Sequence, residues 1–160
     1  MPIYKIADLN IEINPKYEKT SKQLAAYITD EKTADFCVEA EQSEIDRLVA
    51  GGGIDYISES GIINTLVCRE ILDNYDGLFF HSSALMLDGK AYLFSAPSGT
   101  GKSTHTALWQ RHFGGRVQMI NDDKPIIRKK GGVFYVYGTP WMGKSNIGAN
   151  ISAPLGAVFL

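Results

Sequence analysis

The residues best suited to chemistry in this chain form a glycine-rich loop at residues 95–104. Their sequence is Ser-Ala-Pro-Ser-Gly-Thr-Gly-Lys-Ser-Thr. It follows the pattern Gly, four residues, Gly-Lys-Ser/Thr, except that Ala96 takes the place of the first glycine. Gly99 and Gly101 allow backbone conformations in which successive N–H groups turn inward around phosphate oxygens. The loop therefore predicts a phosphate-binding site.

The residues of this loop have separate tasks in holding a nucleoside triphosphate. Lys102 is expected to reach the β- and γ-phosphates, and Ser103 is expected to give its hydroxyl to Mg²⁺. The complete set expected to bind ATP is Ser98, Gly99, Thr100, Gly101, Lys102, Ser103 and Thr104. A glycine-rich turn that carries these letters by chance is the alternative. The context disfavours it, because residues 91–95 predict a strand before the loop and residues 104–113 predict a helix after it.

Two acids follow the next predicted strand. Residues 117–123 read Val-Gln-Met-Ile-Asn-Asp-Asp, so Asp122 and Asp123 stand at the carboxyl end of that strand. Ligands of open α/β sheets bind beyond the carboxyl ends of the strands, so both acids are expected to face the loop. Asp122 is then the expected Mg²⁺ ligand, and Asp123 the expected base for an acceptor hydroxyl. An Asn-Asp-Asp turn before Pro125 is the plain structural alternative.

His81 stands in the middle of an apolar segment, residues 77–87. We predict one strand here, which turns at Asp88-Gly89 into the strand that precedes the loop. Polar side chains inside an apolar strand are costly unless they are hydrogen-bonded. The hairpin brings His81 near the loop, where it can orient an aspartate or contact a phosphate. A histidine satisfied by hydrogen bonds in the core is the alternative.

A third candidate segment, residues 137–144, follows a predicted strand at residues 133–137. Gly143-Lys144 offers a second cation for the triphosphate or for the acceptor. A hairpin turn with a solvated lysine is the alternative, and Trp141 is expected to be a core residue.

These motifs together carry a resemblance to a known family. The stretch Ser98–Thr104, the pair Asp122-Asp123 and the preceding His81 resemble the catalytic domain of HPr kinase/phosphorylase, and more closely the HPr-kinase-related proteins of bacteria. The nucleotide site is also similar to that of ATP-dependent phosphoenolpyruvate carboxykinase. The resemblance covers about residues 78–160. It departs from the family pattern at Ala96 and in a longer segment between Lys102 and the acids.

The resemblance implies an α/β fold with a mixed sheet, built around a P-loop nucleotide-binding core of the HPr-kinase/carboxykinase type. Carried over residue by residue, it places Mg²⁺ on Ser103 and Asp122, the base on Asp123, and a further site residue at His81. The implied activity is that of an ATP-dependent serine kinase, which transfers the γ-phosphoryl group to a serine hydroxyl of a protein or peptide.

Two other functions remain open at this point. A small-molecule kinase or carboxykinase-type enzyme should show additional metal ligands and anion-binding arginines. A nucleotide-binding regulatory or inactive short form needs no acceptor site, although the presence of both acids argues against simple loss of activity.

The composition excludes some partners. The chain of 160 residues has a formal net charge of −2, which offers no basic stripe for nucleic acid. Cys37 and Cys68 are too few for a disulfide framework, and no signal peptide or membrane-length apolar run is present. We therefore expect a soluble cytoplasmic protein with no nucleic-acid or membrane partner.

The clearest break in the chain is Gly51-Gly52-Gly53. It suggests a small α+β segment at residues 1–50 and a nucleotide-binding, kinase-like domain at residues 51–160. Residues 154–160 predict a buried strand, and the chain stops inside it. We therefore expect a chain truncated at the C-terminus, a fragment or a short form. A sheet edge exposed near residues 155–160 would favour a homo-oligomer.

Overall fold

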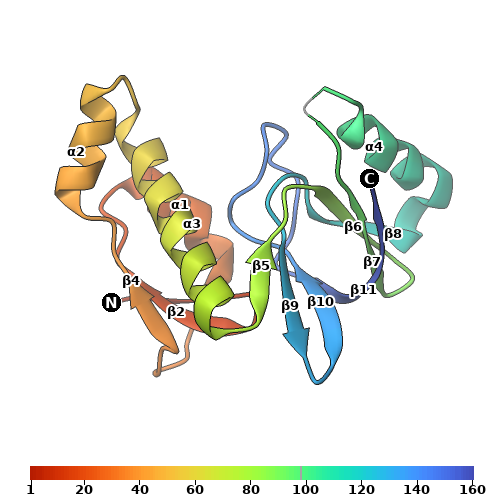
Figure 1. The fold of residues 1–160 in the computed structure, drawn as a ribbon, viewed down its shortest axis with the longest axis horizontal. Helices are drawn as coiled ribbons and strands as arrows, with labels where there is room; N and C mark the ends of the chain where they lie inside the picture. Colours follow the sequence, from red (N-terminus) through yellow and green to blue (C-terminus); the bar gives the residue numbers. More distant parts are fainter. Residues whose placement is uncertain (98) are drawn as a thin grey trace.

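The computed structural model describes residues 1–97 and 99–160, and it shows an α/β protein with two mixed sheets (Figure 1). The first sheet has four strands in the order β3-β1-β2-β4. They are β1 (Ile3–Ile6), β2 (Leu9–Ile13), β3 (Ile28–Thr29) and β4 (Phe36–Val38). Its helices are α1 (Glu18–Leu24), which runs into a 3-10 turn (Ala25–Tyr27), α2 (Gln42–Ala50) and α3 (Asp55–Asn74).

The first sheet and the long helix α3 share one hydrophobic core. Strand β2 alternates between the core and the outside, with Leu9, Ile11 and Ile13 buried. Helix α3 contributes Val67 and Ile71 to the same cluster. The boundary suggested near residue 50 thus falls between α2 and α3, two helices that pack on each other. The division of the chain into domains stays a prediction.

The second sheet has seven strands in the order β5-β9-β10-β11-β7-β6-β8. Its strands and helix are β5 (Gly77–Phe79), β6 (Ser83–Leu87), β7 (Lys90–Phe94), α4 (Lys102–Phe113), β8 (Val117–Asn121), β9 (Ile126–Lys130), β10 (Val133–Tyr137) and β11 (Ser152–Phe159). A 3-10 turn (Gly114–Arg116) joins α4 to β8.

Strand β11 joins two halves of the second sheet, β5-β9-β10 on one side and β7-β6-β8 on the other. Its residues 152–154 pair antiparallel with β10, and an irregularity follows before residues 157–159 continue a parallel ladder with β7. Side chains from both halves, such as Leu93 and Val136, meet in one buried cluster. Beyond Pro154, β7 is the only strand partner of β11 among residues 1–97 and 99–160. One edge is therefore unpaired there, as predicted, and self-association through it stays a prediction.

The topology brings three segments to one edge of the second sheet. Strands β7 and β8 both pair antiparallel with β6, so they run in the same direction and end at the same edge. Strand β6 begins at that edge. The glycine-rich loop after β7, the two aspartates after β8 and His81 before β6 therefore converge, which is the arrangement expected of an α/β ligand site.

The prediction of one strand over residues 77–87 is wrong. The structure has two strands there: β5 pairs with β9 at the far side of the sheet, whereas β6 lies between β7 and β8. Between them, the backbone N–H of Phe80 donates to Pro125 O and that of Ser82 donates to Asp123 O, both at 3.2 Å. The strand is interrupted because residues 80–82 lead the chain from the side of the sheet next to β9 to the place between β7 and β8.

The predicted starts of two helices are also wrong. Ser43, three residues before Asp46, predicts the N-cap of a helix at residues 43–49, but helix α2 begins at Gln42 without a side-chain cap. The apolar spacing of residues 62–72 predicts a helix from Ile62, but helix α3 begins at Asp55, seven residues earlier. Its first two turns bury polar groups, among them Glu59, whose carboxylate accepts the backbone N–H groups of residues 16 and 17. Buried polar residues carry no hydrophobic periodicity, so the pattern missed them.

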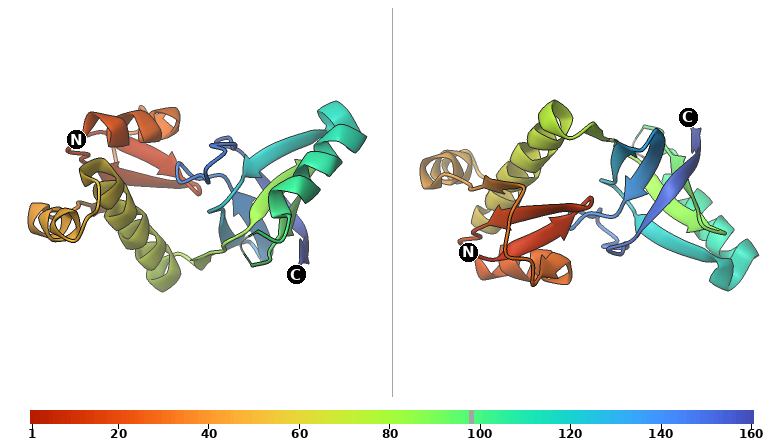
Figure 2. Two further views of the ribbon diagram at one scale, coloured as in Figure 1. Left: turned by 90° about the horizontal axis from the view of Figure 1, so that it is seen from above. Right: turned by 90° about the horizontal axis from the view of Figure 1, so that it is seen from below.

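Hydrogen bonds hold the two sheets against each other. Arg128 of β9 is buried and donates to the backbone oxygens of Ala7, at 2.5 Å, and Tyr75, at 3.0 Å. Asp8 accepts from Lys130 and from the Tyr137 hydroxyl. Burial raises the pKa of Asp8, but these two hydrogen bonds outweigh it, so the pKa lies below its ordinary value. Figure 2 shows the turn between β1 and β2 reaching toward the second sheet.

No helix in the described part of the chain combines the length and apolar character needed to cross a membrane.

Candidate functional site

A cavity of about 490 Å³ opens at the edge where the three segments meet. It brings together most of the residues that the sequence singled out, although Thr100 does not line it. Its lining is His81, Gly99, Gly101, Lys102, Ser103, Thr104, Asp122, Asp123, Gly143, Lys144 and Ser145. Residues from four separate segments of the chain thus face one space.

The glycine-rich loop holds two glycines in backbone conformations that favour glycine. Gly99 has φ of 84° and Gly101 has φ of 100°, values that side-chain-bearing residues rarely adopt. Helix α4 begins immediately after, at Lys102. The N–H groups of its first turn have no acceptor within the helix and carry the positive end of its dipole into the cavity. Ser98, also predicted to bind the nucleotide, lies outside the described residues.

Lys102 lies against its own loop. Its ammonium donates to Ala96 O at 2.6 Å and approaches Pro97 O at 3.4 Å. Phosphate oxygens in the cavity would compete with these carbonyls for the ammonium protons. Because the anion carries full charge, the exchange favours the phosphate.

Asn121 organises the acidic side of the cavity, and sequence reasoning missed it. Its side chain is fully buried at the end of β8. Oδ1 accepts the backbone N–H of Asp123 at 2.8 Å and of Lys124 at 2.6 Å, while Nδ2 donates to the backbone oxygens of Thr139 and Trp141. Asn-Asp-Asp is therefore a side-chain-stabilised turn, the plain alternative considered above, and it is this turn that aims both carboxylates at the cavity.

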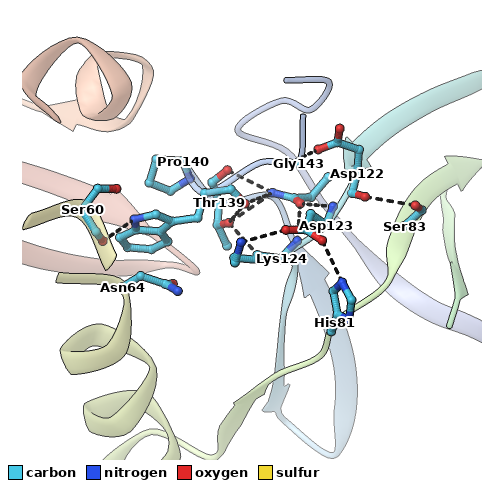
Figure 3. A network of polar contacts seen from close by, with 12 residues as sticks. Ser60, Asn64, His81, Ser83, Asp122, Asp123, Lys124, Thr139, Pro140 and Gly143 are labelled. Atoms are coloured by element: carbon cyan, nitrogen blue, oxygen red, sulfur yellow. Dashed lines mark hydrogen bonds and ion pairs between the residues drawn. The ribbon is translucent and has the colours of Figure 1, made fainter. Parts of the chain in front are cut away.

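Asp122 is fixed by the segment that follows β10. Its Oδ1 accepts the backbone N–H of Gly143 at 2.6 Å, and its backbone oxygen accepts the Ser83 hydroxyl at 3.0 Å (Figure 3). A Cβ on Gly143 would lie 3.1 Å from Asp122 Oδ2, so this close approach favours glycine. Oδ2 has no hydrogen-bond partner among residues 1–97 and 99–160. One carboxylate oxygen is therefore anchored, and the other is left for a ligand.

Asp123 has partners on both oxygens. Oδ1 lies 2.8 Å from His81 Nε2, and Oδ2 accepts from Lys124 Nζ at 2.7 Å. Partial burial raises the pKa of Asp123, but the Lys124 hydrogen bond and charge, together with His81, outweigh it, so the pKa lies below its ordinary value. His81 is exposed and contacts an aspartate, one of the two arrangements expected for it. Lys124 was not predicted, because a lysine beside an acid in a turn carries no distinguishing pattern.

The donor set determines what metal site is feasible. In the described ranges, no group of three or more His, Cys, Asp or Glu residues lies close enough to hold a metal ion. The cavity offers two carboxylates and the Ser103 hydroxyl. Mg²⁺ at phosphate sites typically takes one or two protein carboxylates and completes its shell with phosphate oxygens and water. The residues present therefore fit Mg²⁺ held jointly with a nucleotide.

Trp141 connects this site to the first sheet. The indole is 4% exposed, which confirms its predicted place in the core, and its Nε1 donates to Ser60 O of α3 at 3.1 Å (Figure 3). The neighbouring Pro140 O accepts from the Gln23 amide of α1 at 3.1 Å. The segment that positions Gly143 is thus fastened to helices some eighty or more residues earlier in the chain.

Trp141→Phe should destabilise the protein by about 1–2 kcal/mol, because the buried hydrogen bond from the indole to the Ser60 carbonyl is lost while most of the apolar packing remains. Chemical denaturation monitored by far-UV circular dichroism would measure the loss. The matched control is Trp109→Phe on α4, since Trp109 is only partly buried and its indole N–H makes no hydrogen bond among the described residues. Equal stability losses for the two variants would contradict a structural role for the Trp141 hydrogen bond.

Comparison with known proteins adds little to this geometry. A scan against protein-family models and a search of curated proteins gave no match. Among solved structures, the chain is similar to the HPr(Ser) kinase/phosphatase from Coxiella burnetii, with 22% sequence identity and a TM-score of 0.30. The similarity covers 36% of this chain and 33% of that one. The chain therefore shows a distant and partial structural similarity to an HPr(Ser) kinase/phosphatase.

Proposed function

We propose that this protein binds ATP with Mg²⁺ and transfers the γ-phosphoryl group to a serine hydroxyl of a protein or peptide. One observation carries the proposal: a single cavity of about 490 Å³ holds the glycine-rich loop, Lys102 and both aspartates. These are the parts that phosphoryl transfer requires, namely a phosphate cradle, a cation, carboxylates for the metal and a carboxylate for the acceptor.

The two aspartates differ in a way that suits different tasks. Asp122 keeps Oδ2 without a hydrogen bond among the described residues, which favours it as the carboxylate that holds Mg²⁺ together with the Ser103 hydroxyl. Mg²⁺ would there neutralise charge on the triphosphate. Asp123 is oriented by His81 and Lys124, which favours it as the group that receives the acceptor hydroxyl. His81 is then a positioning residue for Asp123.

The proposed step is an in-line displacement. The acceptor oxygen forms a bond to the γ-phosphorus, and the bond from that phosphorus to the β,γ-bridging oxygen breaks, so ADP leaves. The hydroxyl proton passes to the Asp123 carboxylate. A carboxylate with a lowered pKa is a weak base, but the transition state of phosphoryl transfer is loose, and positioning of the hydroxyl supplies much of the effect. Lys102, together with Lys144 at the rim, would stabilise charge on the transferring group.

The carboxykinase alternative has less support. An enzyme of that type should present arginines to an anionic substrate, and no arginine lines the cavity in the part of the chain that the structure describes. Arg116 is paired with Asp88 at the β6–β7 turn, and Arg128 is buried against the first sheet. Both arginines are committed to structural contacts.

The direct test is a calorimetric titration with ATP in the presence of Mg²⁺ and again with excess EDTA, followed by an assay of radiolabel transfer from γ-labelled ATP to serine-containing peptides. The proposal expects saturable binding that weakens when the metal is removed, and label on serine. Binding without any transfer would favour a regulatory module. Absence of binding would refute the proposed function.

A further inference from the structure

A second cavity, of about 570 Å³, lies on the other side of the segment that carries Gly143. Its walls come from α1, from the first turns of α3 and from residues 140–146. It therefore lies between the first sheet's helices and the site, at the place where the hydrogen bonds of Trp141 and Pro140 join them. Its volume is within the range usual for ligand pockets, which often occur between structural units.

One tight turn separates the two cavities. The backbone N–H of Asn146 donates to Gly143 O at 3.0 Å, which closes a turn over residues 143–146. Gly143, Lys144 and Ser145 line the first cavity, while Met142 and Asn146 line the second. A molecule that reaches from one cavity to the other would therefore pass along this turn, close to Asp122 and Asp123.

The lining of the second cavity is cationic. It includes Lys19 and Lys22 on one face of α1, and its lining contains no carboxylate. Lys22 forms an ion pair with Glu18 at 2.7 Å, but both side chains are more than 70% exposed, so solvent screens the pair and the lysine remains able to bind an anion. Lys19 lies 4.3 Å from the centre of the Tyr56 ring.

The rest of the lining offers hydrogen bonds and apolar contacts. The Gln23, Ser60 and Asn146 side chains supply polar groups, and Tyr56 and Met142 supply apolar surface. The cavity thus suits a chain that carries acidic groups together with methylene or backbone portions, such as a peptide.

We propose that this second cavity binds acidic residues that flank the phosphorylated serine of the acceptor peptide. The inference rests on the proposed function. A cavity of this volume is roughly 10 Å across, and an extended peptide covers that distance in about three residues. A molecule whose hydroxyl lies beside Asp123 and whose carboxylate lies beside Lys19 must pass the turn at residues 143–146, which an extended peptide can do. A peptide is therefore the acceptor that the two cavities fit.

The test measures binding, so it does not depend on turnover. Two fluorescein-labelled nine-residue peptides with a central serine are compared by fluorescence anisotropy, one flanked by glutamates and one with every glutamate replaced by lysine. A non-hydrolysable ATP analogue and Mg²⁺ are present throughout. The wild type should bind the acidic peptide at least tenfold more tightly than the basic one, and Lys19→Glu/Lys22→Glu should reverse the preference. The matched control, Lys32→Glu/Lys90→Glu, changes the net charge equally at exposed positions outside the cavity. It should keep the preference for the acidic peptide.

Each remaining outcome decides against the inference. An unchanged preference in the Lys19→Glu/Lys22→Glu variant would show that the acidic peptide binds elsewhere. A reversal in the control variant as well would show that only net charge is measured. Binding of citrate that depends on Lys19 and Lys22, without binding of the acidic peptide, would replace the peptide with a small anion. Calorimetry with Mg·ATP on the wild type and the same variants separates the two proposals. No ATP binding by the wild type would refute the proposed function. Normal ATP binding by the wild type without a preference for the acidic peptide would refute this inference alone.

Discussion

Lys102→Ala should weaken the binding of Mg·ATP by about 100-fold, or roughly 2.7 kcal/mol. The lysine is the first residue of α4 and lines the cavity beside the two aspartates. The nearby carboxylates repel the β- and γ-phosphates, and the compact ammonium of the lysine offsets this repulsion. Hydrogen bonds between charged groups are also roughly twice as strong as neutral ones. Isothermal titration calorimetry of both proteins at one ionic strength would measure the difference.

Two further variants make the result specific. Lys32→Ala removes an exposed lysine from the turn between β3 and β4 and should leave the affinity unchanged. Lys144→Ala should cause a smaller loss than Lys102→Ala, because Lys144 is exposed at the rim of the cavity. Equal ATP affinity in the wild type and Lys102→Ala would mean that the loop does not hold the triphosphate.

Much of the second sheet could be predicted from local patterns. The β6–β7 hairpin was set by Asp88-Gly89, which both adopt positive φ, and the order strand, glycine loop, helix was found as expected from residue 90 to residue 113. Hydrophobic alternation and turn residues act over a few positions, so a single sequence reveals them.

The parts that could not be predicted depend on long-range contacts. Strand β9 was missed, and with it the pairing that separates β5 from β6 and leaves His81 between two strands. The buried Asn121 looks like any turn asparagine in the sequence, yet its amide ties the aspartate turn to residues 139 and 141. No local pattern shows that the Trp141 indole reaches Ser60, eighty-one positions earlier.

These long-range bonds give the first sheet a part in the site. Trp141 and Pro140 are bonded to α3 and α1, and the segment they fasten supplies the N–H that fixes Asp122. A group held on two sides by packed elements loses little freedom when substrate binds, and such pre-organisation supports precise positioning of a reacting group. The N-terminal half therefore helps to orient the Asp122 carboxylate and also forms walls of the second cavity.

Asp123→Asn should lower phosphoryl transfer by about 100-fold or more while leaving the affinity for Mg·ATP nearly unchanged. The amide keeps the shape of the carboxylate but can neither receive the hydroxyl proton nor carry the charge that orients His81 and Lys124. Asp122→Asn should instead raise the Mg²⁺ concentration needed for half-maximal binding of ATP, because it removes the carboxylate with an available oxygen. Steady-state ADP release at several Mg²⁺ concentrations would distinguish the two effects.

The pH dependence provides an independent check on the Asp123 assignment. The pKa of Asp123 lies below its ordinary value of 3.8, so the carboxylate is ionised at neutral pH and becomes protonated only as the pH falls through that lowered pKa. Transfer by the wild type should therefore lose no rate through this group until the pH is below about 4. Asp73→Asn removes an equal charge from an exposed position on α3 and serves as the control. Full turnover in Asp123→Asn together with lost turnover in Asp122→Asn would reverse the two roles, because the base would then be the carboxylate that Gly143 anchors.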